Sequence, residues 1–211
     1  MRLAIFLLSG CYCAAQSVSF GVVGGGRSTD DINFAAVSES KRYIIGPMID
    51  IGLPFGFGIE FDALYSREGF RAGNSTPLAT TNINSHSNVW QLPIVVKQSL
   101  PFPVVKPFVE VGYAPRFMNG SIDTSGSFLA TPTQRQSFNM HDSTDWAASH
   151  GVVFGGGVRL HAGRLRLMPE VRYTHWNNMP ILIHFPDGPT VESAQDHVDV
   201  LIGIGWKIAG R

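Results

Sequence analysis

The segment Val198-Asp199-Val200-Leu201-Ile202-Gly203-Ile204-Gly205-Trp206-Lys207-Ile208 decides the fold class of this chain of 211 residues. One parity of the segment is apolar throughout, from Val198 to Ile208. The other parity carries charge or no side chain at Asp199, Gly203, Gly205 and Lys207. A period of two is typical of a β-strand with two different faces, and an amphipathic helix has a period near 3.6.

The same alternation recurs along the chain in segments of about ten residues. Seven further segments share it: 18–25, 42–53, 57–66, 90–97, 109–116, 152–161 and 165–174. With the last segment they predict eight strands in one domain, 17–211. Four prolines fall inside these segments, where each removes a hydrogen-bond donor from the strand ladder, so we expect bulges or staggered strand ends at Pro47, Pro93, Pro107 and Pro169.

The connections between the predicted strands alternate in length. Three are short and rich in Pro or Gly: Pro54-Phe55-Gly56, Pro101-Phe102-Pro103 and Ala162-Gly163-Arg164. Four are long and polar: Gly26 to Lys41, Ala72 to His86, Met118 to Ser149 and Asn178 to Asp196. Short turns at one rim and long loops at the other are typical of an up-and-down transmembrane β-barrel, with the turns in the periplasm.

Charge decides which face of the predicted strands meets lipid. The charged parity holds seven basic and six acidic side chains, and the apolar parity holds almost none. An eight-stranded barrel has an interior that side chains fill, and an unpaired buried charge costs several kcal/mol. We therefore predict a structural ion-pair network of twelve side chains in the lumen; Arg166 lies on the same parity. The twelve are Arg42, Asp50, Glu60, Asp62, Lys97, Glu110, Arg116, Arg159, Glu170, Arg172, Asp199 and Lys207.

Aromatic side chains support the same orientation. Six of them lie toward strand ends on the apolar parity, where amphipathic rings favour the level of the lipid headgroups. They predict an aromatic girdle of Tyr43, Tyr65, Trp90, Tyr113, Tyr173 and Trp206.

The first sixteen residues have the pattern of a secretory signal peptide, 1–16. Arg2 gives a positive start, an apolar stretch follows, and small residues near Ala15 provide a cleavage context. An alternative is a lipobox ending at Cys11, which would leave a lipidated cysteine; a buried N-terminal strand is the third interpretation. Both cysteines lie in this segment, so cleavage near Ala15 removes them and excludes a disulfide framework.

Several strand motifs resemble those of the bacterial outer-membrane β-barrel domain family, whose small members are the OmpX-like and OmpA-like barrels. The motifs are 90–97, 106–112, 155–158 and 169–176. The resemblance implies an eight-stranded outer-membrane barrel. It also implies the barrel-assembly machinery as a partner during insertion, because Gly203 and Trp206 look like its recognition signal, with Ile208 where an aromatic is usual.

Composition and motif spacing give no catalytic, cofactor or metal site. The 16 basic and 16 acidic residues disfavour a nucleic-acid partner. His141-Asp142-Ser143 puts a base beside a nucleophile without a Glu at strand spacing to orient it. The seven histidines lack paired ligand spacing, and the triplets 24–26 and 155–157 are glycines that permit close strand approach rather than a phosphate cradle.

We therefore expect a monomeric, integral outer-membrane protein that is not an enzyme and that contacts outer-membrane lipid. Its role is structural or interactive, with the long loops as a recognition surface for an unknown extracellular ligand. Phe117, Phe128 and Phe138 offer adhesive patches in the longest loop. The alternatives are a secreted soluble calyx for an apolar ligand, a barrel enzyme that modifies lipid A, and a narrow pore.

Overall fold

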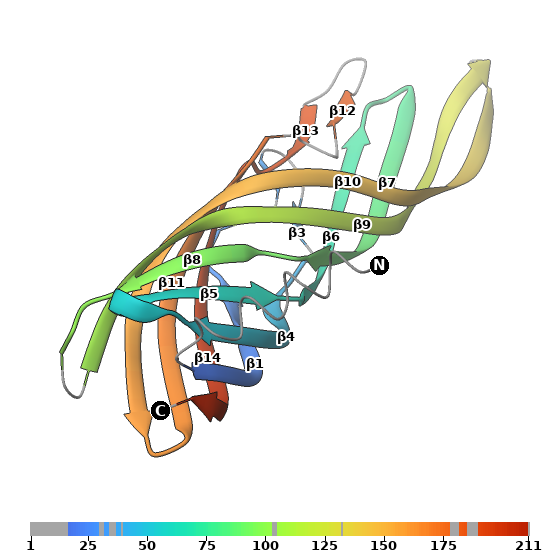
Figure 1. Cartoon of the computed structure of the whole chain (residues 1–211). Coiled ribbons are helices and arrows are strands. Elements are labelled where there is room, and N and C mark those ends of the chain that lie inside the picture. The colour runs from blue at the N-terminus through green and yellow to red at the C-terminus, as the bar shows by residue number, and fades with distance from the viewer. Residues whose placement is uncertain are drawn as a thin grey trace.

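The computed structural model describes residues 17–29, 32–33, 37–38, 40–102, 105–131, 133–177, 182–184 and 190–210, almost all of them in β-strands (Figure 1). The predicted signal peptide, 1–16, lies outside these residues. Among them, no helix is both long and apolar enough to cross a membrane. The only helical element described is the single 3-10 turn η1 (Pro54–Gly56).

Antiparallel pairings join the long strands into a closed ring. The ring contains β1 (Ser17–Arg27), β4 (Lys41–Gly52), β5 (Phe57–Asp62) continued by β6 (Leu64–Ser75), β7 (Ala79–Gln91) continued by β8 (Ile94–Ser99), β9 (Val105–Thr131), β10 (Gln134–Ala162), β11 (Leu165–Trp176) and β14 (Asp196–Gly210). Each strand pairs with the next along the chain, and β14 pairs with β1. With β5–β6 and β7–β8 counted as interrupted strands, the predicted eight-stranded up-and-down barrel is confirmed.

Four short strands lie outside the ring. The strands β12 (Leu182–His184), β13 (Thr190–Ser193) and β2 (Ile32–Asn33) form a separate three-stranded sheet, and β3 (Val37–Ser38) pairs with β6.

Short turns and long hairpins occupy opposite ends of the barrel. The turn between β4 and β5 contains η1, in which Phe55 and Gly56 have φ of 62° and 82°. The turn between β10 and β11 has Gly163 at φ 65°. Both tight links predicted at these positions are confirmed, and the third includes Pro103, which is outside the described residues. We call this end the turn side and the opposite end the loop side.

Prolines lie where the ladder is interrupted, as predicted. Pro47 faces Ala63, the residue that separates β5 from β6, and accepts a hydrogen bond from its amide at 3.0 Å. Pro93 lies in the break between β7 and β8, and Pro107 lies one residue beyond the last pair of β8 with β9. Pro169 lies in a gap between the Gly157–Glu170 and Leu160–Leu167 pairs. The backbone N–H that each proline lacks is thus missing at an interruption of the ladder.

Two of the predicted long loops are strands instead. The segments 72–86 and 118–149 lie largely in the hairpins β6–β7 and β9–β10, which project beyond the barrel on the loop side (Figure 1). The strands β7 and β9 also pair with each other there. The loop prediction failed because both faces of these strands are polar, so no apolar period marks them. We call residues 67–88 and 117–149 the outer extension.

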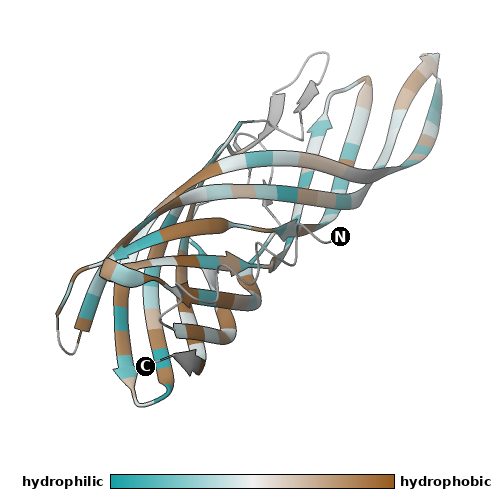
Figure 2. Cartoon of the chain, viewed as in Figure 1, coloured by the Kyte–Doolittle hydropathy of each residue, from teal (hydrophilic) through white to brown (hydrophobic). Residues whose placement is uncertain are grey.

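Apolar residues cover the outside of the ring, and the interior is mixed. Exposed apolar side chains occur on every strand of the barrel, and the hydropathy colours alternate along the ribbons (Figure 2). The inward face also carries apolar residues that the sequence pattern did not show. They form two clusters: Val23, Ile44, Met48, Leu64, Met168 and Leu201, and Val95, Ala114, Val153 and Trp176.

Candidate functional site

The lumen contains most of the side chains predicted to form an ion-pair network. Ten of the twelve are buried: Asp50, Glu60, Asp62, Lys97, Glu110, Arg116, Arg159, Glu170, Arg172 and Asp199. Lys207 is half-buried at the turn side. Arg42 is exposed, which corrects its predicted place, because it lies near the loop end of β4, beyond the part of the strand that encloses a lumen.

A central network of six side chains fills the middle of the lumen. The Arg172 guanidinium lies within 2.6–3.2 Å of carboxylate oxygens of Glu60, Asp62, Glu110 and Glu170. Both Arg172 and Glu60 are almost completely buried, at 2% and 1% of side-chain exposure. A soluble calyx required these two side chains to face bulk water, so that alternative is wrong.

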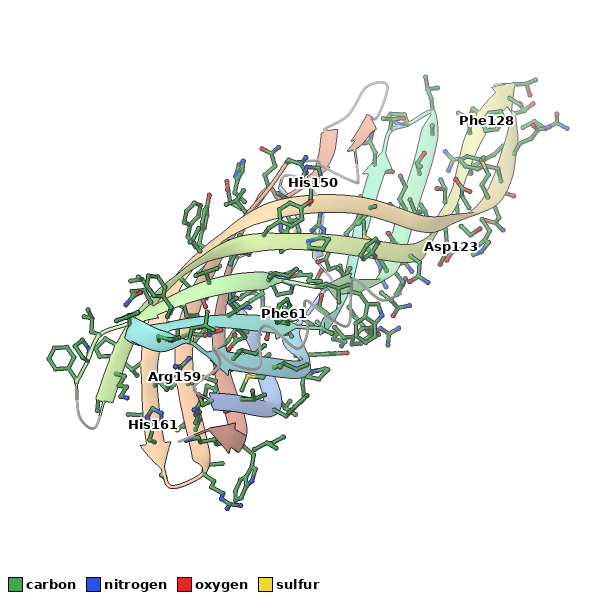
Figure 3. All side chains as sticks on the ribbon, viewed as in Figure 1. Phe61, Asp123, Phe128, His150, Arg159 and His161 are labelled. Atoms are coloured by element: carbon green, nitrogen blue, oxygen red, sulfur yellow. The ribbon has the colours of Figure 1, made fainter. Side chains whose placement is uncertain are left out.

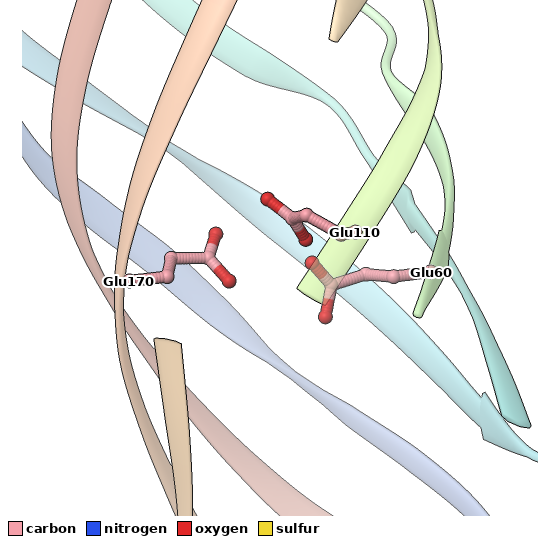
Figure 4. A group of neighbouring side chains, drawn as sticks. All are labelled: Glu60, Glu110 and Glu170. Atoms are coloured by element: carbon pink, nitrogen blue, oxygen red, sulfur yellow. The ribbon is translucent and has the colours of Figure 1, made fainter. Parts of the chain in front are cut away.

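Figure 4 shows three glutamates of this network, Glu60, Glu110 and Glu170, pointing toward one another. The Lys97 ammonium contacts all three. Its Nζ is 2.8 Å from Glu60, 2.9 Å from Glu170 and 3.3 Å from Glu110. The three carboxylates are close enough together to ligate a metal ion. The ammonium contacts all three carboxylates, so the chain's own cation already lies where a metal ion would have to bind.

Gly155 allows two strands that are not neighbours to meet through the central network. It lies on β10 opposite Glu110 of β9 and opposite Arg172 of β11. A Cβ on Gly155 would lie 2.4 Å from Oε1 of Glu110, the atom that accepts from Nε of Arg172 at 3.0 Å. The absent side chain therefore leaves the room in which the ion pair crosses β10, in agreement with the close approach predicted for the triplet 155–157.

A second group of charges lies toward the turn side. Asp50 of β4 accepts hydrogen bonds from Nη2 of Arg159 at 2.6 Å and from Nη1 of Arg166 at 2.9 Å. These two arginines project from β10 and β11, across the lumen from β4. One carboxylate thus serves two guanidinium groups.

A third group lies toward the loop side and was only partly foreseen. Arg27 contacts Asp199 at 3.0 Å and Glu68 at 2.9 Å. Sequence reasoning missed Arg27 and Glu68, because both follow the point at which the apolar alternation of their strands ends. Nearby, the Arg116 guanidinium stacks over the Trp176 ring at 4.2 Å, and its Nε donates to Ser149 at 2.9 Å.

The charges buried in the described part of the lumen are equal in number. The basic ones are Arg27, Lys97, Arg116, Arg159, Arg166 and Arg172, and the acidic ones are Asp50, Glu60, Asp62, Glu110, Glu170 and Asp199. They are not evenly spread, since the central network holds four carboxylates and two cations, whereas the turn-side group holds one carboxylate and two cations.

The predicted aromatic girdle follows the two ends of the apolar surface. Trp206 lies near the turn side and is 53% exposed. The other five are nearer the loop side, where the Tyr65 and Trp90 rings pack with centroids 5.2 Å apart. Tyr43, Trp90, Tyr113 and Tyr173 are exposed, as an interfacial ring requires.

His141, the possible general base of the His141-Asp142-Ser143 motif, lies on the outer extension. Nδ1 of His141 lies 2.6 Å from Asp123 of β9, and both side chains are exposed. Residue spacing could not predict this partner, because Asp123 comes from the opposite strand of the hairpin. Figure 3 shows Asp123 and Phe128 on the projecting part of β9, far along the ribbon from Arg159.

Exposed contacts mark the loop-side rim at the start of β14. Asp196 accepts from Tyr173 at 2.5 Å and contacts Nδ1 of His175 at 2.7 Å. The hydrogen bond with His175, followed by that with Tyr173, lowers the pKa of Asp196 below its ordinary value. A carboxylate that remains charged beside these groups suits a rim in water.

The closed ring, the apolar exterior and the charged interior define the class of the protein: an eight-stranded antiparallel β-barrel of the transmembrane type. Solved structures with a similar strand arrangement include the N-terminal β-barrel domain of Pseudomonas aeruginosa OprF, at 10% identity and a TM-score of 0.43, covering 92% of this chain and 99% of that one. Neisserial surface protein A is similar at 11% identity and a TM-score of 0.46, with coverage of 92% and 99%.

A third similar structure is Ail, the attachment invasion locus protein of Yersinia pestis, in complex with the heparin analogue sucrose octasulfate. It is 12% identical, with a TM-score of 0.43 and coverage of 91% of this chain and 97% of that one. No family model matches the chain, and no curated protein matches it.

Proposed function

We propose that this chain is an integral β-barrel of the bacterial outer membrane, with a plugged lumen and an outer extension that serves as an interaction surface. One observation carries the proposal: polarity is inverted relative to a water-soluble protein. Apolar side chains such as Val109, Val200 and Ile204 are half or more exposed around the outside, while twelve charged side chains are buried inside. Hydrocarbon around the barrel gives a physical reason for both features.

Ion pairing supports a plug rather than a narrow pore. Arg172 and Lys97 together contact all four carboxylates of the central network and tie β5, β8, β9 and β11 across the lumen. Moving one of these side chains aside would leave buried charges without partners, which costs several kcal/mol. A permanently open path therefore has an unfavourable energy at this level of the lumen.

The outer extension supports an interaction role. Within the described residues, β10 pairs with β11 only from Gly151 onward, so the part of β10 from Gln134 to His150 has one edge without a strand partner. An exposed strand edge is a surface on which an extended segment of another protein can pair. Phe128 and Met140 are exposed near its tip, and the Phe128 and Phe138 rings pack 6.5 Å apart.

The role we propose is not enzymatic. His141 is a potential base on an exposed part of the outer extension, whereas the acyl chains that a lipid A-modifying enzyme would act on lie at the apolar belt. Comparing the masses of lipid A from cells with and without the protein tests this. Unchanged acyl chains are expected, and an altered acyl pattern would restore the enzymatic alternative.

Membrane insertion is tested by placing a charge on the apolar belt. Ile202 is 49% exposed on β14, midway between the ends of the apolar surface. We expect Ile202→Arg to cost about 2–4 kcal/mol of unfolding free energy in lipid vesicles. Met140→Arg, at an exposed position of the outer extension, is the matched control and is expected to change it by less than about 0.5 kcal/mol.

Cell fractionation and electrophoresis complete the test. The wild-type chain is expected in the outer-membrane fraction and to migrate differently on a gel before and after boiling. Recovery as a water-soluble periplasmic monomer, or equal tolerance of Ile202→Arg and Met140→Arg, would contradict the proposal.

A further inference from the structure

A pocket opens at the turn side of the lumen, below the central network. Its volume is about 690 Å³, which is in the range of small-molecule sites. Five basic side chains line it: Lys106, Arg159, His161, Arg166 and Lys207. No acidic residue is among the described residues of its wall. Figure 3 shows Arg159 and His161 on the turn-side part of β10. We call this pocket the turn-side mouth.

Positive charge accumulates in the turn-side mouth because its four permanent cations have one carboxylate, Asp50, as their described ion-pair partner, and it pairs with two of them. Asp50 pairs with Arg159 and Arg166, two of the lining residues. Lys106 and Lys207 form no ion pair with any residue that the structure describes, and both are half-buried. Such a group of unneutralised cations in a concave, partly buried site attracts anions.

Two buried donors of the same arginines remain without an acceptor. Nε of Arg159 and Nε of Arg166 lack a hydrogen-bond partner among the described residues. Both side chains are more than nine-tenths buried, at 8% and 6% exposure. Leaving a charged donor unsatisfied in a buried place is costly, and an oxyanion is the acceptor that a guanidinium group binds best.

We propose that the turn-side mouth binds a phosphate group. Its guanidinium groups offer directional donors and the two lysines add point charges, which is the combination that recognises phosphate. Leu53, Phe55 and Leu100 form an apolar part of the same wall. The phosphate therefore comes from a free anion or from a lipid headgroup, whose glycerol and first methylenes the apolar wall can contact.

The site is a property of the barrel itself, while its exposure to the periplasm rests on the proposed function. The test is therefore made on the full chain refolded in a non-ionic detergent, which needs no cell and no membrane orientation. A protein that binds phosphate but fractionates as a soluble protein would refute the proposed function and leave this site intact.

Isothermal titration calorimetry with inorganic phosphate, at constant ionic strength kept with chloride, measures the binding. We expect one saturable site, weakened about tenfold or more in the double variant Lys106→Gln, Lys207→Gln. The matched control is Lys41→Gln, Arg67→Gln, which removes two exposed cations from the opposite end of the barrel. Heat-modifiable migration on a gel verifies that each variant is folded.

A second titration identifies the source of the phosphate. Dihexanoyl phosphatidylglycerol, kept below its micellar concentration, is compared with inorganic phosphate. Tighter binding of the lipid assigns the site to a headgroup, and equal or weaker binding assigns it to a free anion. Should neither probe saturate, or should the double variant and its control bind alike, the phosphate site is refuted. If the double variant fails to fold, competition of sulfate with phosphate on the wild-type chain replaces it, and absence of competition refutes the site.

Discussion

The central network and the turn-side mouth are two charged layers of one lumen. The first has more carboxylates than cations, and the second has more cations than carboxylates. In the central network, two cations contact four carboxylates, and Arg172 alone contacts all four. In the turn-side mouth, one carboxylate contacts two arginines, and two lysines line the same pocket. The first layer uses its cations to hold strands together, whereas the second has cations to spare. The buried acidic and basic side chains of the lumen are equal in number, yet one layer is closed by ion pairs and the next can accept an anion.

The largest expected effect comes from removing the cation that the central network shares. Arg172→Met removes the ion pair of Asp62 and leaves Lys97 as the remaining cation in contact with Glu60, Glu110 and Glu170, so we expect a loss of about 3–5 kcal/mol of unfolding free energy, or failure to fold. Urea unfolding in micelles measures the loss, and a folded variant should also conduct ions in a planar bilayer.

Arg67→Met is the control for this substitution, because Arg67 is exposed. We expect it to change the unfolding free energy by less than about 0.5 kcal/mol. An unfolding midpoint of Arg172→Met equal to that of Arg67→Met would show that the central network does not stabilise the barrel.

A smaller loss of unfolding free energy is expected when one arginine of the turn-side mouth is replaced. Arg166→Met leaves Asp50 paired with Arg159, so the expected cost is that of one charge-assisted hydrogen bond, about 1.5–3 kcal/mol. The same variant should bind inorganic phosphate more weakly than wild type. A cost equal to that of Arg172→Met would remove the contrast between the two layers.

The smallest expected effect is a shift in the titration of His161, whose side chain lines the turn-side mouth.

A bound phosphate adds negative charge beside His161, so its pKa should rise when the site is filled. Nuclear magnetic resonance of the imidazole protons, with and without phosphate, measures the change. By linkage, protonation of the imidazole should strengthen the binding of phosphate. A pKa that does not respond to saturating phosphate would place the anion away from His161.

The sequence predicted the barrel well because its signals are local. Alternation of two residues, short Pro/Gly turns and the charge on one parity all follow from neighbours along one strand. The predicted position of Arg42 and the loops predicted at 72–86 and 118–149 were wrong, since parity does not tell where the lumen ends and polar strands carry no apolar period. Arg27 and Glu68 were missed for the same reason.

By itself, the sequence determined the number of strands in the ring, the direction of the apolar face and the near balance of buried charge. Only the tertiary structure decided which charges meet, because register and the space left by Gly155 bring together residues that are far apart along the chain. It also decided that Asp50 is shared by two arginines, which leaves the turn-side mouth positive. Pairing depends on distances across the lumen, and alternation along a strand carries no information about these distances.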